Sequence, residues 1–132
     1  MFTLSIVTQE KVLFDQEVAS VIAPGSEGYL GILTNHAPLI TALVPGQLTV
    51  KDSNNNETYY AVSGGFLEVS GNVATILADT VEPTQEIDIK RAEEAIKRCR
   101  ERLDHKDGVD IPRALIAKRR AENRLKVYRD NT

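Results

Sequence analysis

The spacing of apolar residues changes once along the chain, just after Pro83, and this change limits the possible folds most. Before it, apolar and polar residues alternate, as in FTLSIVT near the start, and a period of two is typical of half-buried β-strands. After it, small and apolar residues recur every three or four positions, which is the period of an amphipathic helix. The sequence therefore predicts a β domain over residues 1–84 and a helical domain over residues 85–132.

Turn signals divide the first domain into short strands. The cluster SNNN separates QLTVKD from ETYYAV, and Ser70-Gly71-Asn72 separates FLEV from VATILAD. Each of these pairs is expected to form a hairpin. Short strands that are separated by frequent turns predict an antiparallel β-sandwich or a flattened barrel.

Two helices separated by HKDGVD are expected in the second domain. The first spans Ile87–Asp104, with Asp88 as its N-cap. The second follows Asp110, also a suitable N-cap, has Pro112 in its first turn and ends near Tyr128. The apolar stripes are Ala92, Ala95, Ile96, Cys99 and Leu103 in the first helix and Ala114, Ala117, Ala121, Leu125 and Tyr128 in the second.

These alanine-rich stripes let the two helix axes approach closely, so an antiparallel hairpin is expected. A core of this size supplies about 3–5 kcal/mol at most. Because alanine buries little apolar area, the hairpin should also depend on a second surface, either its own β domain or a partner protein. This dependence predicts a movable element.

Charge is distributed unevenly between the two halves. Residues 1–86 contain two basic and ten acidic side chains, a net charge of −8, whereas residues 87–132 contain fourteen basic and nine acidic ones, a net charge of +5. This asymmetry indicates two modules with different partners. The simplest interpretation of the basic second helix is a solvated face. The functional alternatives are contact with an acidic protein surface or with an anionic ligand held by several arginines.

Nucleic-acid and membrane binding are poorly supported. The chain is acidic overall, with a net charge of −3, and its basic second helix has one aromatic residue, Tyr128, for base stacking. Alanines also give this helix a weak apolar face for a membrane surface. The first residues, MFTLSIVTQEK, predict neither a signal peptide nor a transmembrane helix.

The sequence offers no pattern typical of a catalytic or metal site. It has neither GxxxxGK[ST] nor GxGxxG, and Ser63 lacks the GxSxG context of a nucleophile. His36 and His105 lie far apart, and Cys99 is the single cysteine, so no metal-ligating set is expected. We expect a protein that is not an enzyme and requires no cofactor.

Several motifs, in order along the chain, resemble the ε subunit of bacterial F-type ATP synthases. They are GYLGILTNHAPLITALVPGQLTV and VSGGFLEVSGNVATILADTVE in the β half, then Ile87-Asp88-Ile89-Lys90-Arg91-Ala92 and Arg120-Ala121-Glu122-Asn123-Arg124-Leu125 in the helices. The resemblance spans essentially the whole chain. It implies a non-catalytic rotor subunit of a proton-translocating ATP synthase that couples the γ subunit to the membrane c-ring.

The resemblance also implies partners and a location. The expected partners are the γ subunit, the c-ring and the catalytic β and α subunits, and no nucleic acid. The chain would be a peripheral protein on the cytoplasmic side of the inner membrane. Tyr29 and His36 lie in the segment expected to face γ and the c-ring, and many members of the family carry a carboxylate at the place of Tyr29.

In this family the C-terminal hairpin has two states, and the resemblance implies both here. Folded onto the β domain, the hairpin permits ATP hydrolysis, whereas extended along γ it contacts a catalytic subunit and blocks hydrolysis. The residues expected to make the inhibitory contact are Arg113, Lys118, Arg119, Arg120, Arg124 and Lys126.

In some bacterial members the folded hairpin binds ATP without hydrolysing it, so a regulatory ATP is expected. The residues that match that pattern are Glu82, Ile87, Asp88, Arg91, Ala92, Arg98, Arg120 and Arg124. Two other interpretations remain alternatives to the rotor subunit: a free-standing nucleotide-sensing module and a nucleic-acid-binding protein that uses its basic helix.

Overall fold

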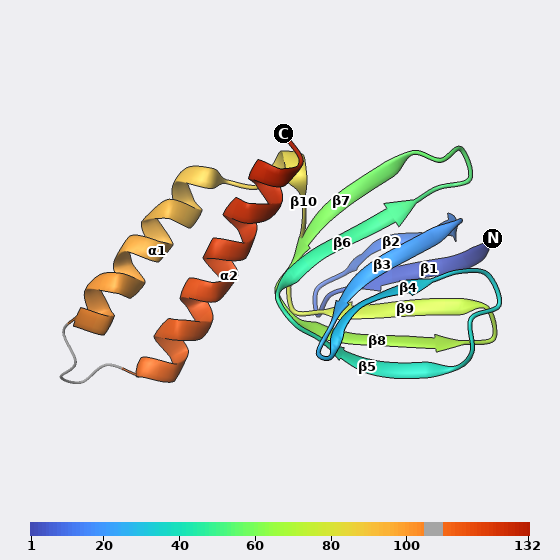
Figure 1. Cartoon of the computed structure of the whole chain (residues 1–132), viewed down its shortest axis with the longest axis horizontal. Helices are drawn as coiled ribbons and strands as arrows, with labels where there is room; N and C mark the ends of the chain where they lie inside the picture. Colours follow the sequence, from blue (N-terminus) through green and yellow to red (C-terminus); the bar gives the residue numbers. More distant parts are fainter. Residues whose placement is uncertain (105–109) are drawn as a thin grey trace.

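The computed structural model describes residues 1–104 and 110–132, so the loop residue His105 lies outside the described residues. A curved β-sandwich forms one end of the molecule and a hairpin of two helices forms the other (Figure 1). The strands are β1 (Phe2–Val7), β2 (Val12–Val18), β3 (Ser20–Gly25), β4 (Gly28–Ile32), β5 (Leu39–Leu43), β6 (Gly46–Lys51), β7 (Glu57–Val62), β8 (Gly65–Ser70), β9 (Val73–Ala78) and β10 (Val81–Pro83). A short 3-10 helix, η1 (Thr84–Glu86), leads to α1 (Ile89–Asp104) and α2 (Ile111–Asp130).

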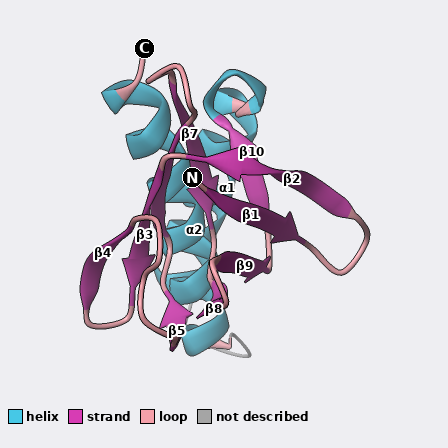
Figure 2. Cartoon of the chain, turned by 90° about the vertical axis from the view of Figure 1, so that its right-hand side faces the viewer, coloured by secondary structure: helices cyan, strands magenta, loops and turns pink. Residues whose placement is uncertain are grey.

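The strands join in one sheet that curves to form both layers of the sandwich (Figure 2). Their order is β10-β7-β6-β3-β5-β8-β9-β1-β2, with β4 paired to β3. The expected sandwich is confirmed, but the expectation that all strands run antiparallel is wrong, because β1 lies parallel to β9. A parallel pair needs a long connection, and the whole run of chain between these two strands supplies it.

Both hairpins predicted from turn residues are present: β6 pairs with β7, and β8 pairs with β9. The second is closed by Gly71 and Asn72, whose φ values are +56° and +60°. Positive φ at both central residues is typical of a type I′ hairpin turn, and glycine and asparagine tolerate this conformation best. The local turn chemistry therefore fixes the register of this hairpin.

Alternate strand residues fill the space between the two layers. Phe2, Leu4 and Ile6 are buried, as their alternation predicts, and Leu48 and Leu67 are fully covered beside them. Each large apolar side chain that is fully buried contributes about 1.5–3 kcal/mol. Because this core contains no helical residue, the sandwich does not need the hairpin to bury its apolar face.

The helices begin where their sequence caps predict. The side chain of Asp88 accepts a hydrogen bond from the backbone N–H of Arg91 at 3.0 Å, and Asp110 accepts one from Arg113 at 3.1 Å. These bonds satisfy backbone donors that have no partner within the helix.

The interface between the helices is small. Its buried residues are Ala92, Ile96, Ala121 and Leu125, with Ala95 and Ile89 partly buried against them. The prediction that Ala117 belongs to the buried stripe is wrong, because this residue is exposed. Ala117 lies about 60° around the helix from the buried Ala114, and this rotation turns its side chain out of the interface with α1.

The helix α2 lies between α1 and the sandwich, so α2 makes the contact with the β domain (Figure 1). Its C-terminal half packs against β6, β7 and η1. The apolar part of this contact consists of Ala61, Ile87 and Val127, with Tyr128 partly buried beside them. We call this arrangement, in which α2 lies on β6 and β7, the docked hairpin.

We expect the substitution Gly65→Ala to lower the free energy of unfolding by about 2–4 kcal/mol. Gly65 has a φ of +136°, and an added Cβ would lie 2.0 Å from the backbone oxygen of Leu77. The control is Gly31→Ala, because a Cβ at Gly31 meets no atom within 4 Å, and it should change the value by less than about 1 kcal/mol. Urea denaturation followed by circular dichroism measures both, and equal stabilities would contradict this account of the β8 strand.

Candidate functional site

Some of the residues expected to bind ATP lie close together where β10 leads into the helices. Glu82 lies in β10, and the guanidinium of Arg124 on α2 donates a hydrogen bond to its carboxylate. Both side chains are only partly exposed, so solvent screens this ion pair less than it screens a surface pair. The structure thus joins two of the predicted residues that are 42 positions apart in the sequence.

Arg120 lies one turn before Arg124 on the same side of α2. One of its terminal nitrogens is 3.5 Å from a carboxylate oxygen of Asp79, which follows β9. Its Nε atom is buried and has no hydrogen-bond partner among the described residues. An unpaired buried donor is costly, so the docked hairpin leaves one favourable hydrogen bond of Arg120 unmade.

Two further residues of the predicted ATP set have packing roles. Ala92 of α1 packs against Ala121 and Leu125 of α2, where a larger side chain would separate the helices. Ile87 packs against Val127 at the base of the hairpin. These contacts place the N-terminus of α1, with its Asp88 cap, beside the C-terminal half of α2.

Arg91 and Arg98 complete the predicted ATP set, and the structure does not bring them into contact with the arginines of α2. Both are exposed on α1, and neither forms an ion pair within the described residues. They are seven residues apart, so they share one side of the helix. Any ligand that joined all four arginines would have to bridge the two helices.

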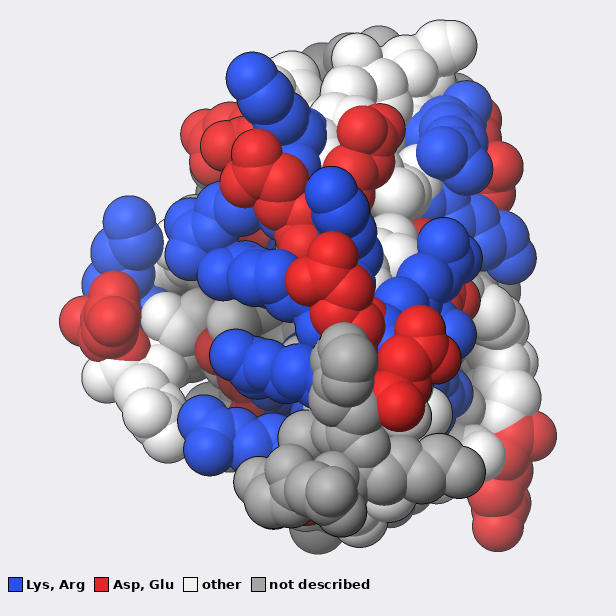
Figure 3. Space-filling model, turned by 90° about the vertical axis from the view of Figure 1, so that its left-hand side faces the viewer, with Lys and Arg blue, Asp and Glu red and all other residues white. Residues whose placement is uncertain are grey.

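The residues expected to inhibit fall into two groups. Three of them form ion pairs. Arg120 pairs with Asp79, Arg124 pairs with Glu82, and Lys118 lies 3.6 Å from Glu122 within α2. Lys and Arg side chains gather at the helical end of the molecule, but Asp and Glu are interspersed among them (Figure 3). Of the six residues expected to inhibit, Arg113, Arg119 and Lys126 are exposed and form no ion pair within the described part of the chain.

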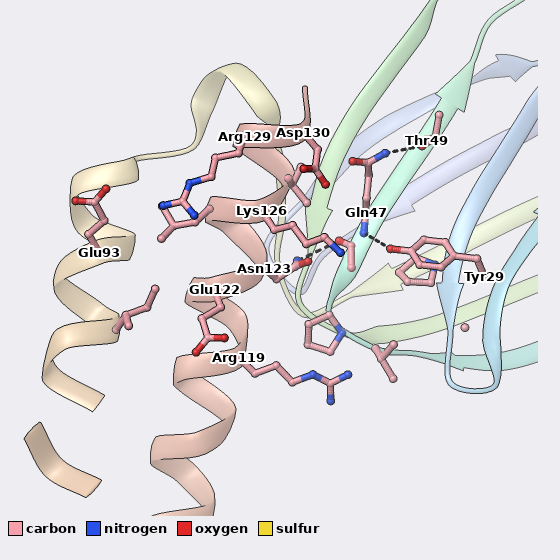
Figure 4. A pocket seen from close by; sticks show the side chains of 18 of the residues that line it. Tyr29, Gln47, Thr49, Glu93, Arg119, Glu122, Asn123, Lys126, Arg129 and Asp130 are labelled. Atoms are coloured by element: carbon pink, nitrogen blue, oxygen red, sulfur yellow. Dashed lines mark hydrogen bonds between the residues drawn. The ribbon is translucent and has the colours of Figure 1, made fainter. Parts of the chain in front are cut away.

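A groove of about 1400 Å³ separates the hairpin from one side of the sandwich. Arg119 and Lys126 point from α2 toward the sandwich side of this groove, whereas Arg129 points toward α1 (Figure 4). The opposite wall includes Pro24 and Tyr29. None of the residues expected to bind ATP lines this groove.

Tyr29 lies near the start of β4, and His36 lies in the loop that joins β4 to β5. The Tyr29 hydroxyl accepts a hydrogen bond of 3.0 Å from the backbone N–H of Gln47, beside the groove. The ring Nδ1 of His36 is 2.7 Å from the carbonyl oxygen of Ala37. The loop of His36 is tied to the N-terminus, which lies on the side of the sandwich away from the hairpin (Figure 1). The expected interface segment thus presents two separate surfaces.

An exposed apolar row on the sandwich was not predicted from the sequence. Phe66 of β8 lies directly opposite Leu77 of β9, and Ile40 of β5 is diagonal to Phe66. These side chains are 57%, 52% and 73% exposed, respectively. The alternation of β8 carries a signal for this row, because Phe66 occupies a position that should face solvent. A group of large apolar side chains on an outer face marks an interaction surface.

Two tyrosines of β7 have perturbed pKa values. Burial raises the pKa of Tyr60, and the nearby charge of Glu86 raises it further. The pKa of Tyr59 is raised mainly by its hydrogen bond to Glu57. Both shifts favour the neutral phenol, and the Tyr59 hydroxyl donates its hydrogen bond to Glu57.

The described residues hold no group of three or more His, Cys, Asp or Glu side chains that could bind a metal ion. Within the same residues, no helix has both the length and the apolar character needed to cross a membrane.

The comparisons with known proteins match both parts of the chain. Residues 1–84 match the family model described as the ATP synthase delta/epsilon chain beta-sandwich domain, and residues 85–129 match the delta/epsilon chain long alpha-helix domain. The ATP synthase epsilon chain of Moorella thermoacetica is 49% identical over 124 residues, which are 93% of this chain and 92% of that one. The epsilon chain of Desulforamulus reducens is 48% identical and covers 93% of both chains.

Chains in two solved ATP synthase structures have a similar fold. A chain in the Euglena gracilis mitochondrial ATP synthase structure, described as OSCP/F1/c-ring in rotational state 1, is 28% identical, with a TM-score of 0.81. The match covers 91% of this chain and 76% of that one. A chain in the central stalk/c-ring structure of the Tetrahymena thermophila mitochondrial ATP synthase has the same fold, with a TM-score of 0.62 at 14% identity, and the match covers 97% and 93% of the two chains. The β-sandwich and the helical hairpin match the two domains of this family, and the relatives are epsilon chains. The chain therefore belongs to the ATP synthase delta/epsilon chain family, as an epsilon chain.

Proposed function

We propose that this epsilon chain is a non-catalytic rotor subunit that couples γ to the c-ring, and that its hairpin inhibits ATP hydrolysis when it leaves the sandwich. The observation that carries this proposal is the small apolar contact of the docked hairpin, whose buried residues are Ala61, Ile87 and Val127. A difference in partner binding of about 5.5 kcal/mol moves a two-state equilibrium from 1:99 to 99:1. Partner binding can therefore supply enough free energy to separate the hairpin from the sandwich.

Two arginines have different partners in the two proposed states. Arg120 and Arg124 face Asp79 and Glu82 while the hairpin is docked. They can bind carboxylates of a catalytic subunit only after these pairs separate, so docking and inhibition exclude one another. Arg113, Lys118, Arg119 and Lys126 complete the proposed inhibitory surface. Because several of these are exposed while the hairpin is docked, they supply attraction before release.

We further propose that ATP binds the docked hairpin and favours it. The unpaired Nε of Arg120 supports this proposal, because a phosphate oxygen would satisfy that buried donor. The guanidinium of Arg124 lies one turn away, on the same side of α2, and its contact with Glu82 places a carboxylate there as well. A ligand that binds only the docked state stabilises it by mass action. The proposed ATP residues are Glu82, Ile87, Asp88, Arg91, Ala92, Arg98, Arg120 and Arg124.

The sandwich supplies the proposed contacts with the rotor. We assign the apolar row Ile40, Phe66 and Leu77 to γ, because burying this row would stabilise a permanent complex. The His36 loop, on the side away from the hairpin, is assigned to the c-ring. Through these contacts the chain would be held on the cytoplasmic side of the membrane as a peripheral subunit. A free-standing nucleotide-sensing module would leave this apolar row exposed to water, so the row disfavours that alternative.

Removing the hairpin is expected to abolish inhibition and preserve binding. We would add the full chain, or a truncation that ends at Glu86, to a catalytic head complex depleted of this subunit, and follow ATP hydrolysis. Because the sandwich core contains no helical residue, the truncation should still fold and bind γ. The full chain should suppress hydrolysis and the truncation should not. Equal hydrolysis rates with both bound chains would contradict the inhibitory role.

The substitution Arg120→Ala is expected to weaken ATP binding by at least about tenfold, because one charge-assisted contact contributes about 1.5–3 kcal/mol. Arg119→Ala is the matched control, since Arg119 is adjacent on α2 but lines the groove instead. Calorimetric titration of the isolated chain at millimolar ATP measures both. If the original chain releases no heat of binding, the proposal of a regulatory ATP is wrong.

The substitution Phe66→Glu is expected to weaken γ binding by at least about tenfold, because central aromatic side chains dominate interface energies. Val12→Glu in β2 serves as the control, since Val12 is 60% exposed but lies outside the apolar row. Surface plasmon resonance with immobilised γ gives both affinities. Equal losses for the two variants would reject the assignment of this face.

A further inference from the structure

The C-terminal half of α2 is attached to the sandwich by the side-chain amides of two asparagines. The Nδ2 of Asn123 donates to the carbonyl oxygens of Gly46 at 3.1 Å and Val62 at 3.2 Å. Gly46 and Val62 face one another as the first residue of β6 and the last of β7. An asparagine amide has two N–H donors, and here each has its own backbone acceptor from a different strand.

The second amide lies two turns further along α2. Asn131, which ends this helix, donates from Nδ2 to the side-chain oxygen of Gln47 at 2.7 Å and to the backbone oxygen of Val127 at 2.7 Å. Gln47 is itself held from two sides: its backbone N–H donates to the Tyr29 hydroxyl, and its side-chain amide donates to Thr49 (Figure 4). The acceptor that Asn131 meets is therefore already oriented.

The strand position beneath Asn123 accepts only glycine. A Cβ at Gly46 would lie 2.5 Å from the ring of Pro24 and 2.8 Å from the Tyr29 hydroxyl. The backbone of β6 is consequently pressed against β3 and β4 on one side while its carbonyl faces α2. Both acceptors of Asn123 thus belong to the backbone of the sandwich, whereas the sandwich acceptor of Asn131 is the oriented side chain of Gln47.

We propose that Asn123 and Asn131 form an amide clasp that determines how much of the hairpin is docked. The buried apolar contact around Val127 is small, so directional hydrogen bonds carry a large share of the docking free energy. Both amides become solvated when the hairpin extends, so release leaves no buried donor unpaired. Unlike the arginine pairs, the clasp contains no charged group, and salt or an anionic ligand does not compete for it. This inference rests on the proposed two-state hairpin.

The test uses thiol labelling of the isolated full chain, with Cys99→Ser to remove the buried native thiol and Ala61→Cys as the reporter. Ala61 is 3% exposed and packs with Ile87 and with Val127 of α2, so departure of α2 from the sandwich should uncover its replacement thiol. In fast exchange, the labelling rate with an aromatic disulfide reagent is proportional to the undocked fraction.

The substitution Asn123→Leu, which keeps the side-chain size and removes both donors, should raise the labelling rate by about tenfold or more. Asn123→Asp, a second variant of the same shape, should do the same, because a carboxylate repels the two carbonyl oxygens. Glu122→Leu is the matched control on the adjacent residue and should leave the rate within about twofold of the parent. Circular dichroism confirms that each variant remains folded.

Labelling rates for both Asn123 variants that stay within twofold of the parent would overturn the clasp. The labelling result does not depend on whether the hairpin inhibits ATP hydrolysis. If Asn123→Leu accelerates labelling but does not deepen inhibition of the head complex, the clasp stands and the inhibitory role fails. The labelling experiment contains no γ and no catalytic subunit, so it tests only the attachment of the hairpin.

Discussion

The contact between the C-terminal half of α2 and the ends of β6 and β7 is the interaction on which the arrangement of the two parts depends. The sandwich has its own apolar core, and the helices share only a small one. Between these two lies a single buried apolar cluster, centred on Val127, with hydrogen bonds and ion pairs around it. The position of the hairpin is therefore the least strongly determined feature of the fold.

Arginines and asparagines have different roles in this contact. Arg120 and Arg124 face carboxylates that an anionic ligand or an acidic partner could replace, so their contribution depends on salt and on what is bound. Asn123 binds backbone oxygens of β6 and β7, and Asn131 binds the side-chain oxygen of Gln47 on β6, so these neutral hydrogen bonds position α2 on the sandwich. The arginines are therefore suited to recognising an anionic ligand or an acidic partner, whereas the asparagines are suited to positioning α2 on the sandwich.

The sequence was sufficient to predict what depends on local chemistry. The alternation in β1, the turn at Gly71 and Asn72 and the caps at Asp88 and Asp110 are all confirmed, because each depends on residues within a few positions.

What depends on distant packing was not predicted. The parallel pairing of β1 with β9 and the exposure of Ala117 both follow from which elements meet in space. Asn123 and Gly46 are 77 positions apart, and nothing in either local pattern indicates their hydrogen bond. The same holds for the exposed row around Phe66, since an aromatic residue in a strand is usually assigned to the core.

A polar docking surface also has a physical advantage for a hairpin that changes position. A large apolar contact would hold α2 firmly, but its release would expose patches that aggregate or bind unrelated partners. Here the released surface of α2 would present Asn123 and the two arginines, all of which water solvates well, and from the apolar cluster Val127 and Tyr128. Both the docked and the extended hairpin can then persist in water, so partner binding can choose between them.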